Sequence, residues 1–305
     1  MTPSPVYFAD DPAQVSALFL AAGLDKLVAP GADVALKIHF GEPGNTAYLK
    51  PDRVRPVAEL ITKLGGKPFY TDCNTLYRGP RQQTKTHLDV ARDHGYFLER
   101  AGAEAVISEE SDQAIVAVGL KHFQKIYLGG VIARTGTLIA LTHFKGHELS
   151  GFGGALKNIG MGCGSRLGKL KMHQDCANCA EVKTCRRNQT LEACWVGPPA
   201  LVQERFVEYA AGVVRGKRTG FVTFLTDLSP QCDCYPRNDP PVVPDLGVLV
   251  SADPVAIDQA AADLVNKAAG RDVWRALYPD VDWTTQLVYA ESLALGSRNY
   301  ELVVK

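Results

Sequence analysis

Four cysteines lie close together in the second half of the chain. Cys176 and Cys179 form a CxxC pair, Cys185 follows after five intervening residues, and Cys194 follows after eight more. A CxxC pair places two sulfur atoms on one tight turn, and two further thiolates complete the four ligands of an iron–sulfur cluster or a zinc ion. The spacing differs from the bacterial ferredoxin run. It favours an iron–sulfur cluster over structural zinc, and either metal over unligated or redox thiols.

A second group of three cysteines lies outside that cluster. Cys163 stands in a glycine-rich stretch, and Cys232 and Cys234 follow a stretch expected to be a strand. If the fold brings these three together, they hold a second cluster and leave one coordination position open for substrate. The alternative is that they are small buried residues in tight turns. Cys73 stands apart from both groups, and we expect it to be structural.

Histidine and lysine residues follow two of the expected strands. His143 and His147 come at the end of one strand, glycine-rich chain leads from them to Lys157, and His39 follows another strand. Such groups can bind an anion, transfer protons or hold a metal ion. We expect these four to be catalytic candidates at one strand-end crevice, where open α/β sheets bind ligands; a purely hydrogen-bonded role is the alternative. Further polar residues follow the next strand and are expected there, unless they only cap a turn: Asp72, Asn74, Tyr77 and Arg78.

The composition limits the class of protein. The chain has 305 residues, of which 46% are hydrophobic, and this suffices for a large core in one or two domains. Basic and acidic residues balance at 33 each, so no overall field draws the chain to nucleic acid or to an anionic membrane, and neither partner is expected. The expected partner is a small-molecule substrate or a redox partner protein, and a homo-oligomer stays open.

The N-terminal residues show no basic stretch followed by an apolar run, and no stretch reaches the roughly 18 apolar residues that a membrane span needs. We therefore expect a cytoplasmic protein, in which eight cysteines favour metal ligation over disulfides. Dinucleotide-binding, P-loop and serine hydrolase motifs are missing from the sequence, so those classes have no support.

Short apolar runs alternate with amphipathic stretches, which is typical of helices packed on a largely parallel sheet. The sequence therefore predicts an α/β fold, in which a mostly parallel sheet has flanking helices and a Cys-rich metal-binding insert. The expected strands span residues 33–39, 68–71, 105–108, 137–143, 220–225 and 246–250. The expected helices span residues 51–64, 85–94, 200–214 and 254–267.

The glycine-rich segment 146–187 breaks this alternation, and we expect it to be a loop that carries site residues. The insert is expected at residues 171–197, between two parts of the α/β body at residues 1–170 and 198–305. Asp253 precedes a proline at the first position of an expected helix, so its carboxylate should cap that helix.

Several of these stretches together resemble the family called domain of unknown function 362, whose members are iron–sulfur proteins of mostly uncharacterised role. The matching stretches are residues 37–42, 74–79, 146–169, 232–234 and 245–258. The resemblance implies an α/β body with a ferredoxin-like insert that carries two four-cysteine motifs. Here the insert holds only four cysteines, so it supports one cluster, while Cys163, Cys232 and Cys234 match the motif of the body. One or two clusters of the 4Fe–4S type are therefore expected, with zinc as the alternative.

Residues 143–160 are also similar to the glycine-rich stretch of lactate racemase-like proteins, with Lys157 at the position of a family lysine. Three functions follow as expectations. The first is an iron–sulfur oxidoreductase or electron-transfer protein, in which the cluster of the insert serves a small-molecule pocket at the strand ends. The second is a non-redox acid/base enzyme of the isomerase or lyase type with a structural metal site. The third is a binding or scaffold protein.

Overall fold

The structure, a computed structural model, describes residues 2–305. Its central sheet has seven strands in the order β11-β1-β10-β9-β6-β2-β3. These strands are β1 (Ser4–Ala9), β2 (Asp33–Lys37), β3 (Lys67–Thr71), β6 (Thr137–His143), β9 (Arg218–Leu225), β10 (Gly247–Ser251) and β11 (Tyr300–Val304). Only β10 runs antiparallel to its neighbours; all other neighbouring pairs are parallel. The predicted α/β fold with a mostly parallel sheet is confirmed.

Helices and two small hairpins surround this sheet. The helices are α1 (Val15–Ala21), α2 (Pro51–Lys63), α3 (Thr84–Asp93), α4 (Leu98–Ala101), α5 (Gly130–Arg134), α6 (Ala155–Cys163), α7 (Arg166–His173), α8 (Arg187–Thr190), α9 (Pro199–Val214), α10 (Pro254–Ala269), α11 (Val273–Leu277) and α12 (Thr285–Ser292). The hairpins pair β4 (Gln113–Ala117) with β5 (Lys125–Gly129), and β7 (Lys145–His147) with β8 (Gly151–Gly153). Within residues 2–305, none of the helices has both the length and the apolar character that crossing a bilayer requires.

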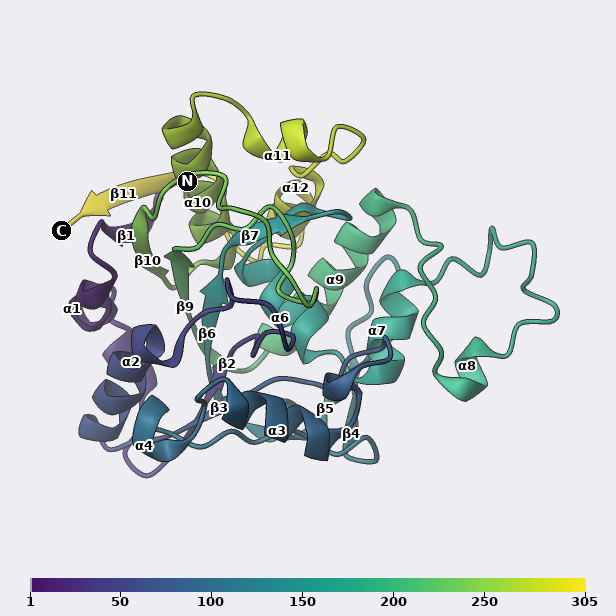
Figure 1. Cartoon of the computed structure of the whole chain (residues 1–305), viewed down its shortest axis with the longest axis horizontal. Coiled ribbons are helices and arrows are strands. Elements are labelled where there is room, and N and C mark those ends of the chain that lie inside the picture. The colour runs from purple at the N-terminus through teal and green to yellow at the C-terminus, as the bar shows by residue number, and fades with distance from the viewer. Residues whose placement is uncertain (1) are drawn as a thin grey trace.

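The sheet separates two hydrophobic cores. Because successive side chains of a strand point to opposite faces, Leu138 and Ala140 of β6 enter one core, and Ile139 and Leu141 enter the other. Helices α6, α9, α10 and α12 pack on the first face, whereas α1 and α2 pack on the second (Figure 1). Burial on both faces explains why the central strands read as continuous apolar runs in the sequence.

The expectation of a loop over residues 146–187 is wrong for much of that segment, because α6 and α7 lie within it. Glycine disfavours a helix in isolation, but α6 needs small residues where it packs on α9. A Cβ atom at Gly160 would lie 2.1 Å from the carbonyl oxygen of Phe206. Tertiary packing therefore overrides the low helix propensity of this stretch.

Two aspartates of the stretch 245–258 cap two different helices. The Asp253 carboxylate accepts the N–H groups of Val255 and Ala256, which confirms the predicted cap of α10. Asp258, one turn further on, accepts the N–H groups of Ala155 and Leu156 at 2.6 and 2.9 Å, so α10 caps the start of α6. Burial raises the pKa of Asp258 to about 7, although both hydrogen bonds favour its ionised form.

This raised pKa predicts a pH-dependent effect of Asp258→Asn on stability. Folded Asp258 binds a proton more tightly than the unfolded residue does, so its contribution is fully present below about pH 4 and is lost as the pH rises through about 7. The stability of the wild type relative to the variant should fall by about 1 kcal/mol per pH unit in that window. Denaturant unfolding at several pH values measures the difference, with exposed Asp280→Asn as the control. A difference that does not vary with pH would contradict the prediction.

Candidate functional site

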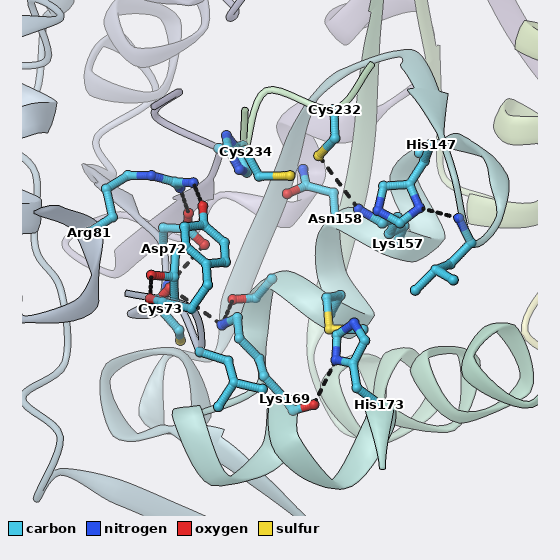
Figure 2. A pocket seen from close by; sticks show the side chains of 18 of the residues that line it. Asp72, Cys73, Arg81, His147, Lys157, Asn158, Lys169, His173, Cys232 and Cys234 are labelled. Atoms are coloured by element: carbon cyan, nitrogen blue, oxygen red, sulfur yellow. Dashed lines mark hydrogen bonds and ion pairs between the residues drawn. The ribbon is translucent and has the colours of Figure 1, made fainter. Parts of the chain in front are cut away.

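A cavity of about 440 Å³ lies at the carboxyl ends of the parallel strands (Figure 2). Lys37 ends β2, Asp72 follows β3 and Lys145 follows β6, so three neighbouring strands each deliver one charged residue to its wall. Lys157 reaches the wall from α6, and Cys232 reaches it from the loop after β9. This edge is where open α/β sheets bind ligands.

Basic side chains dominate the polar part of the wall. Five basic residues and two carboxylates line it: Lys37, Arg81, Lys145, Lys157 and Lys169, with Asp72 and Glu148. Three of the cations pair with buried carboxylates: Lys37 with Asp72 at 3.0 Å, Arg81 with Glu42 at 2.8 Å, and Lys145 with Asp233 at 3.1 Å. Lys169 donates instead to three backbone carbonyl oxygens. Within residues 2–305, the Lys157 ammonium group has only a sulfur atom, Cys232 Sγ at 3.9 Å, as its hydrogen-bond partner.

Two histidines of the wall are neutral and offer N–H groups. The Nδ1 atom of His39 accepts the backbone N–H of Gly41 at 3.1 Å, and that of His147 accepts the N–H of Leu149 at 3.2 Å. Burial, and then the nearby cations, hold the pKa of both rings well below the usual range. A neutral ring that accepts at Nδ1 carries its proton on Nε2. Each ring is therefore a hydrogen-bond donor at Nε2.

His173, in the last turn of α7, has the opposite tautomer. Its Nδ1 atom donates to the carbonyl oxygen of Lys169 at 2.8 Å, which leaves a lone pair on Nε2. Burial lowers the pKa of His173 to about 4 in spite of that hydrogen bond, and the charges of Lys157 and Lys169 contribute, so the ring is neutral. The cavity wall thus contains histidines of both tautomers.

Cys232 and Cys234 lie side by side at the cavity, close to Lys157 (Figure 2). A hydrogen bond from Cys234, helped by the charges of Lys157 and Lys145, outweighs burial and lowers the pKa of Cys232 to about 6. The same hydrogen bond raises the pKa of Cys234 well above its usual value. The pair therefore holds one thiolate and one thiol beside an ammonium group.

His143 lies outside the cavity lining, where it supports the loop between the two cysteines. Its Nδ1 atom lies 2.9 Å from both carboxylate oxygens of Asp233, and its Nε2 atom lies 2.9 Å from the carbonyl oxygen of Thr226. Burial opposes ionisation of Asp233, but the charges of His143 and Lys145 outweigh it and hold the Asp233 pKa below its usual range. This geometry gives His143 a positioning role.

Cys163 lies apart from the Cys232–Cys234 pair. It ends α6, where the thiol of Cys73 donates to its carbonyl oxygen at 3.4 Å, and burial raises the pKa of Cys163 to about 12. Within residues 2–305, no group of three or more His, Cys, Asp or Glu side chains lies close enough to hold a metal ion. The three-thiol group expected from Cys163, Cys232 and Cys234 is therefore not assembled in this structure, in which Cys163 ends α6 beside Cys73.

The Cys-rich segment, residues 174–198 between α7 and α9, projects from the body and includes α8 (Figure 1). Cys176 and Cys179 are half-buried, Cys185 is exposed, and Cys194 is buried against the body. Four thiols suit a soft metal, but the part of the chain that the structure describes does not gather them into one ligand group. A cluster or zinc ion on these cysteines therefore stays a prediction.

Of the other expected pocket residues, Asp72 and Tyr77 line the cavity. Asn74 lies outside the lining, where its side chain donates to Thr84 at 2.9 Å, and Arg78 also lies outside it. The sequence did not indicate Lys169 or His173 as site residues. These two stand four residues apart and therefore lie on one face of α7. The sequence predicted a loop in place of this helix, so their common face was not recognised.

Fold and site together define an α/β protein with a cation-lined cavity at the strand ends of its sheet. The chain belongs to the family described as Domain of unknown function (DUF362), whose model matches residues 34–263, and the predicted membership is confirmed. No curated protein matches the chain.

Two solved structures have a distant likeness to this fold. The lactate racemase apoprotein from Thermoanaerobacterium thermosaccharolyticum has 13% identity and a TM-score of 0.45, over 73% of this chain and 51% of that chain. A protein from Thermotoga maritima has 10% identity and a TM-score of 0.39, over 70% of this chain and 50% of that chain. The chain thus spans about half the length of each. Likenesses this distant do not identify a function.

The buried network around Asp233 predicts that Asp233→Asn destabilises the protein. Without the carboxylate charge, Lys145 loses its buried ion pair and His143 loses the charged partner of its Nδ1 atom, which should cost about 3 kcal/mol. Urea unfolding at neutral pH measures the loss. Asp239→Asn, on the exposed part of the same loop, is the control and should change little. A loss for Asp233→Asn no larger than that of the control would show that the network does not stabilise the fold.

Proposed function

We propose that the chain is an enzyme that binds a small carboxylate in this cavity and transfers a proton to or from this substrate. One observation supports the proposal above all. Among residues 2–305, the Lys157 ammonium group stands in the wall without an oxygen partner, beside neutral histidines of both tautomers.

Lys157 is the expected anchor of the carboxylate. Burial lowers its pKa, but nearby negative charge, first that of the Cys232 thiolate, outweighs burial and raises it, so the group stays an ammonium ion. A carboxylate oxygen would give this ammonium ion a charge-assisted hydrogen bond to oxygen in addition to its long contact with the Cys232 sulfur. His147, whose ring interacts electrostatically with Lys157, offers a second donor from Nε2. Such bonds are stronger in a poorly solvated cavity than at the surface.

His173 is the expected base, because its Nδ1 atom donates its proton to the carbonyl oxygen of Lys169 and its Nε2 atom keeps a lone pair that can accept a proton. Without a bound anion, burial and the charges of Lys157 and Lys169 keep its pKa at about 4, which makes it a weak base. A bound carboxylate adds negative charge and neutralises Lys157, so the His173 pKa rises toward the range in which a general base works at neutral pH. The substrate would thus strengthen the base that acts on it.

This assignment predicts that Lys157→Met weakens carboxylate binding. Methionine keeps most of the side-chain length and removes the charge, so affinity for straight-chain carboxylates from acetate to hexanoate should fall at least roughly tenfold. Calorimetric titration measures the affinities. Lys85→Met, at an exposed position of α3, is the matched control and should bind as the wild type does. Equal affinities in the Lys157 and Lys85 variants would contradict the proposed anchor.

We also propose that the Cys-rich segment binds an iron–sulfur cluster, or a zinc ion in its place. The donor set supports this: four thiols fall within nineteen residues, on a segment held to the body at both ends. The Arg205 guanidinium donates to the carbonyl oxygen of Gln174 at one end, and the Gly197 N–H donates to that of His173 at the other. A redox cluster there would make the protein an iron–sulfur oxidoreductase or electron-transfer protein; a structural metal would leave the proton-transfer function as it is.

Metal analysis tests this second proposal. Protein isolated under strict anaerobiosis should contain iron and acid-labile sulfide, with a broad visible absorption that dithionite bleaches. Cys179→Ser and Cys185→Ser should lose that signal because each removes a thiolate, whereas Cys73→Ser, outside the segment, should keep it. A colourless protein that holds zinc would replace the cluster by the zinc alternative. Protein with neither metal would contradict both.

A further inference from the structure

Trp195 forms an apolar rim of the cavity. Its side chain lines the cavity and is 50% exposed, whereas Trp274 and Trp283 are 0% and 7% exposed. The indole meets the ring of His173 edge-on, with an angle of 85° and 4.5 Å between the ring centroids. A large aromatic ring that is half-exposed at the mouth of a cavity leaves apolar surface for a ligand to cover.

The backbone on both sides of Trp195 is fixed. Before it, Cys194 is buried in a small cluster with Leu76 and Leu170. After it, the Gly197 N–H donates to the carbonyl oxygen of His173 at 2.8 Å. A Cβ atom at Gly197 would lie 2.7 Å from that same oxygen, so the close approach needs glycine. The chain before and after Trp195 is therefore held in place, and this keeps the indole at the rim of the cavity.

The cavity as a whole has a charged part and an apolar part. Beside the basic residues already described, its wall contains six large apolar or aromatic side chains: Leu76, Tyr77, Leu149, Met161, Trp195 and Tyr235. A volume of about 440 Å³ falls in the range of sites that bind ligands of drug size, and it exceeds what the shortest carboxylic acids fill. The apolar part of the wall therefore offers contacts to a ligand that is larger than a short acid.

We infer that the site prefers a carboxylate that bears an aromatic ring, with its acid group at Lys157 and its ring against Trp195. Trp195 is then a specificity-determining residue, contributed by the Cys-rich segment rather than by the sheet. This inference rests on the proposed carboxylate function. Ring burial against an indole adds binding that an acid without a ring cannot gain, because aromatic pairs attract each other beyond the area that they bury.

Calorimetric titration with phenylacetate and acetate tests the inference, since the two acids differ only in the ring. The wild type should bind phenylacetate at least roughly tenfold more tightly than acetate. Trp195→Ala should lose most of this preference while its affinity for acetate stays unchanged, and Trp195→Phe should keep it. Val196→Ala is the matched control, because Val196 is the next residue, is 49% exposed and lies outside the cavity lining.

Fluorescence gives a second measurement that does not depend on how Trp195→Ala folds. Trp195 is the most exposed of the three tryptophans, so phenylacetate should change the emission of the wild type, and Trp195→Phe should lose that change. If the wild type binds neither acid, the carboxylate function itself fails. If it binds both acids equally, if Trp195→Ala keeps the preference, or if phenylacetate leaves the emission unchanged, the specificity role of Trp195 is overturned while the carboxylate site stands.

Discussion

The burial of several like charges around one cavity is the constraint on which the rest of the site depends. Three basic side chains of the cavity wall have a buried carboxylate within 3.1 Å: Lys37 with Asp72, Arg81 with Glu42, and Lys145 with Asp233. Removing one partner of such a pair leaves an uncompensated charge in a poorly solvated site, which costs far more than breaking a surface ion pair. Each cation therefore holds its carboxylate in place, and each pair also holds together the chain segments that carry its two residues.

The same constraint makes Lys157 exceptional, because it is the wall cation whose described partner is sulfur rather than oxygen. It stands on α6, which is held from two sides. Asp258 of α10 caps its first N–H groups, and Gly160 allows its close approach to Phe206 of α9. A charged group on a rigid helix loses little conformational freedom when it binds a ligand, and such preorganisation favours affinity.

The sequence predicted those elements whose apolar pattern is set by burial in the sheet and its covering helices. Four expected helices lie within two residues of α2, α3, α9 and α10, and five expected strands correspond to β2, β3, β6, β9 and β10. The sixth expected strand, at residues 105–108, is wrong, because only Ala105 forms an isolated bridge, with Tyr70. The strands β1 and β11 were missed, since they come from opposite ends of the chain and pair with each other. Helices α6 and α7 were missed because packing compensates for their glycines. Because α7 was not predicted, His173 was not recognised as a site residue. Because Cys163 lies at the end of α6, it stands beside Cys73 rather than Cys232.

The Cys-rich segment and the cavity share part of one wall, so the two proposed functions are physically connected. Cys194, an expected metal ligand, directly precedes Trp195, and Trp195 contacts His173. A metal that fixes the position of Cys194 would also fix the rim of the cavity. Linkage is reciprocal: if metal binding changes the affinity for a carboxylate, carboxylate binding must change the affinity for the metal by the same factor. The projecting segment is thus connected to the cavity through two adjacent residues, Cys194 and Trp195, and one aromatic contact.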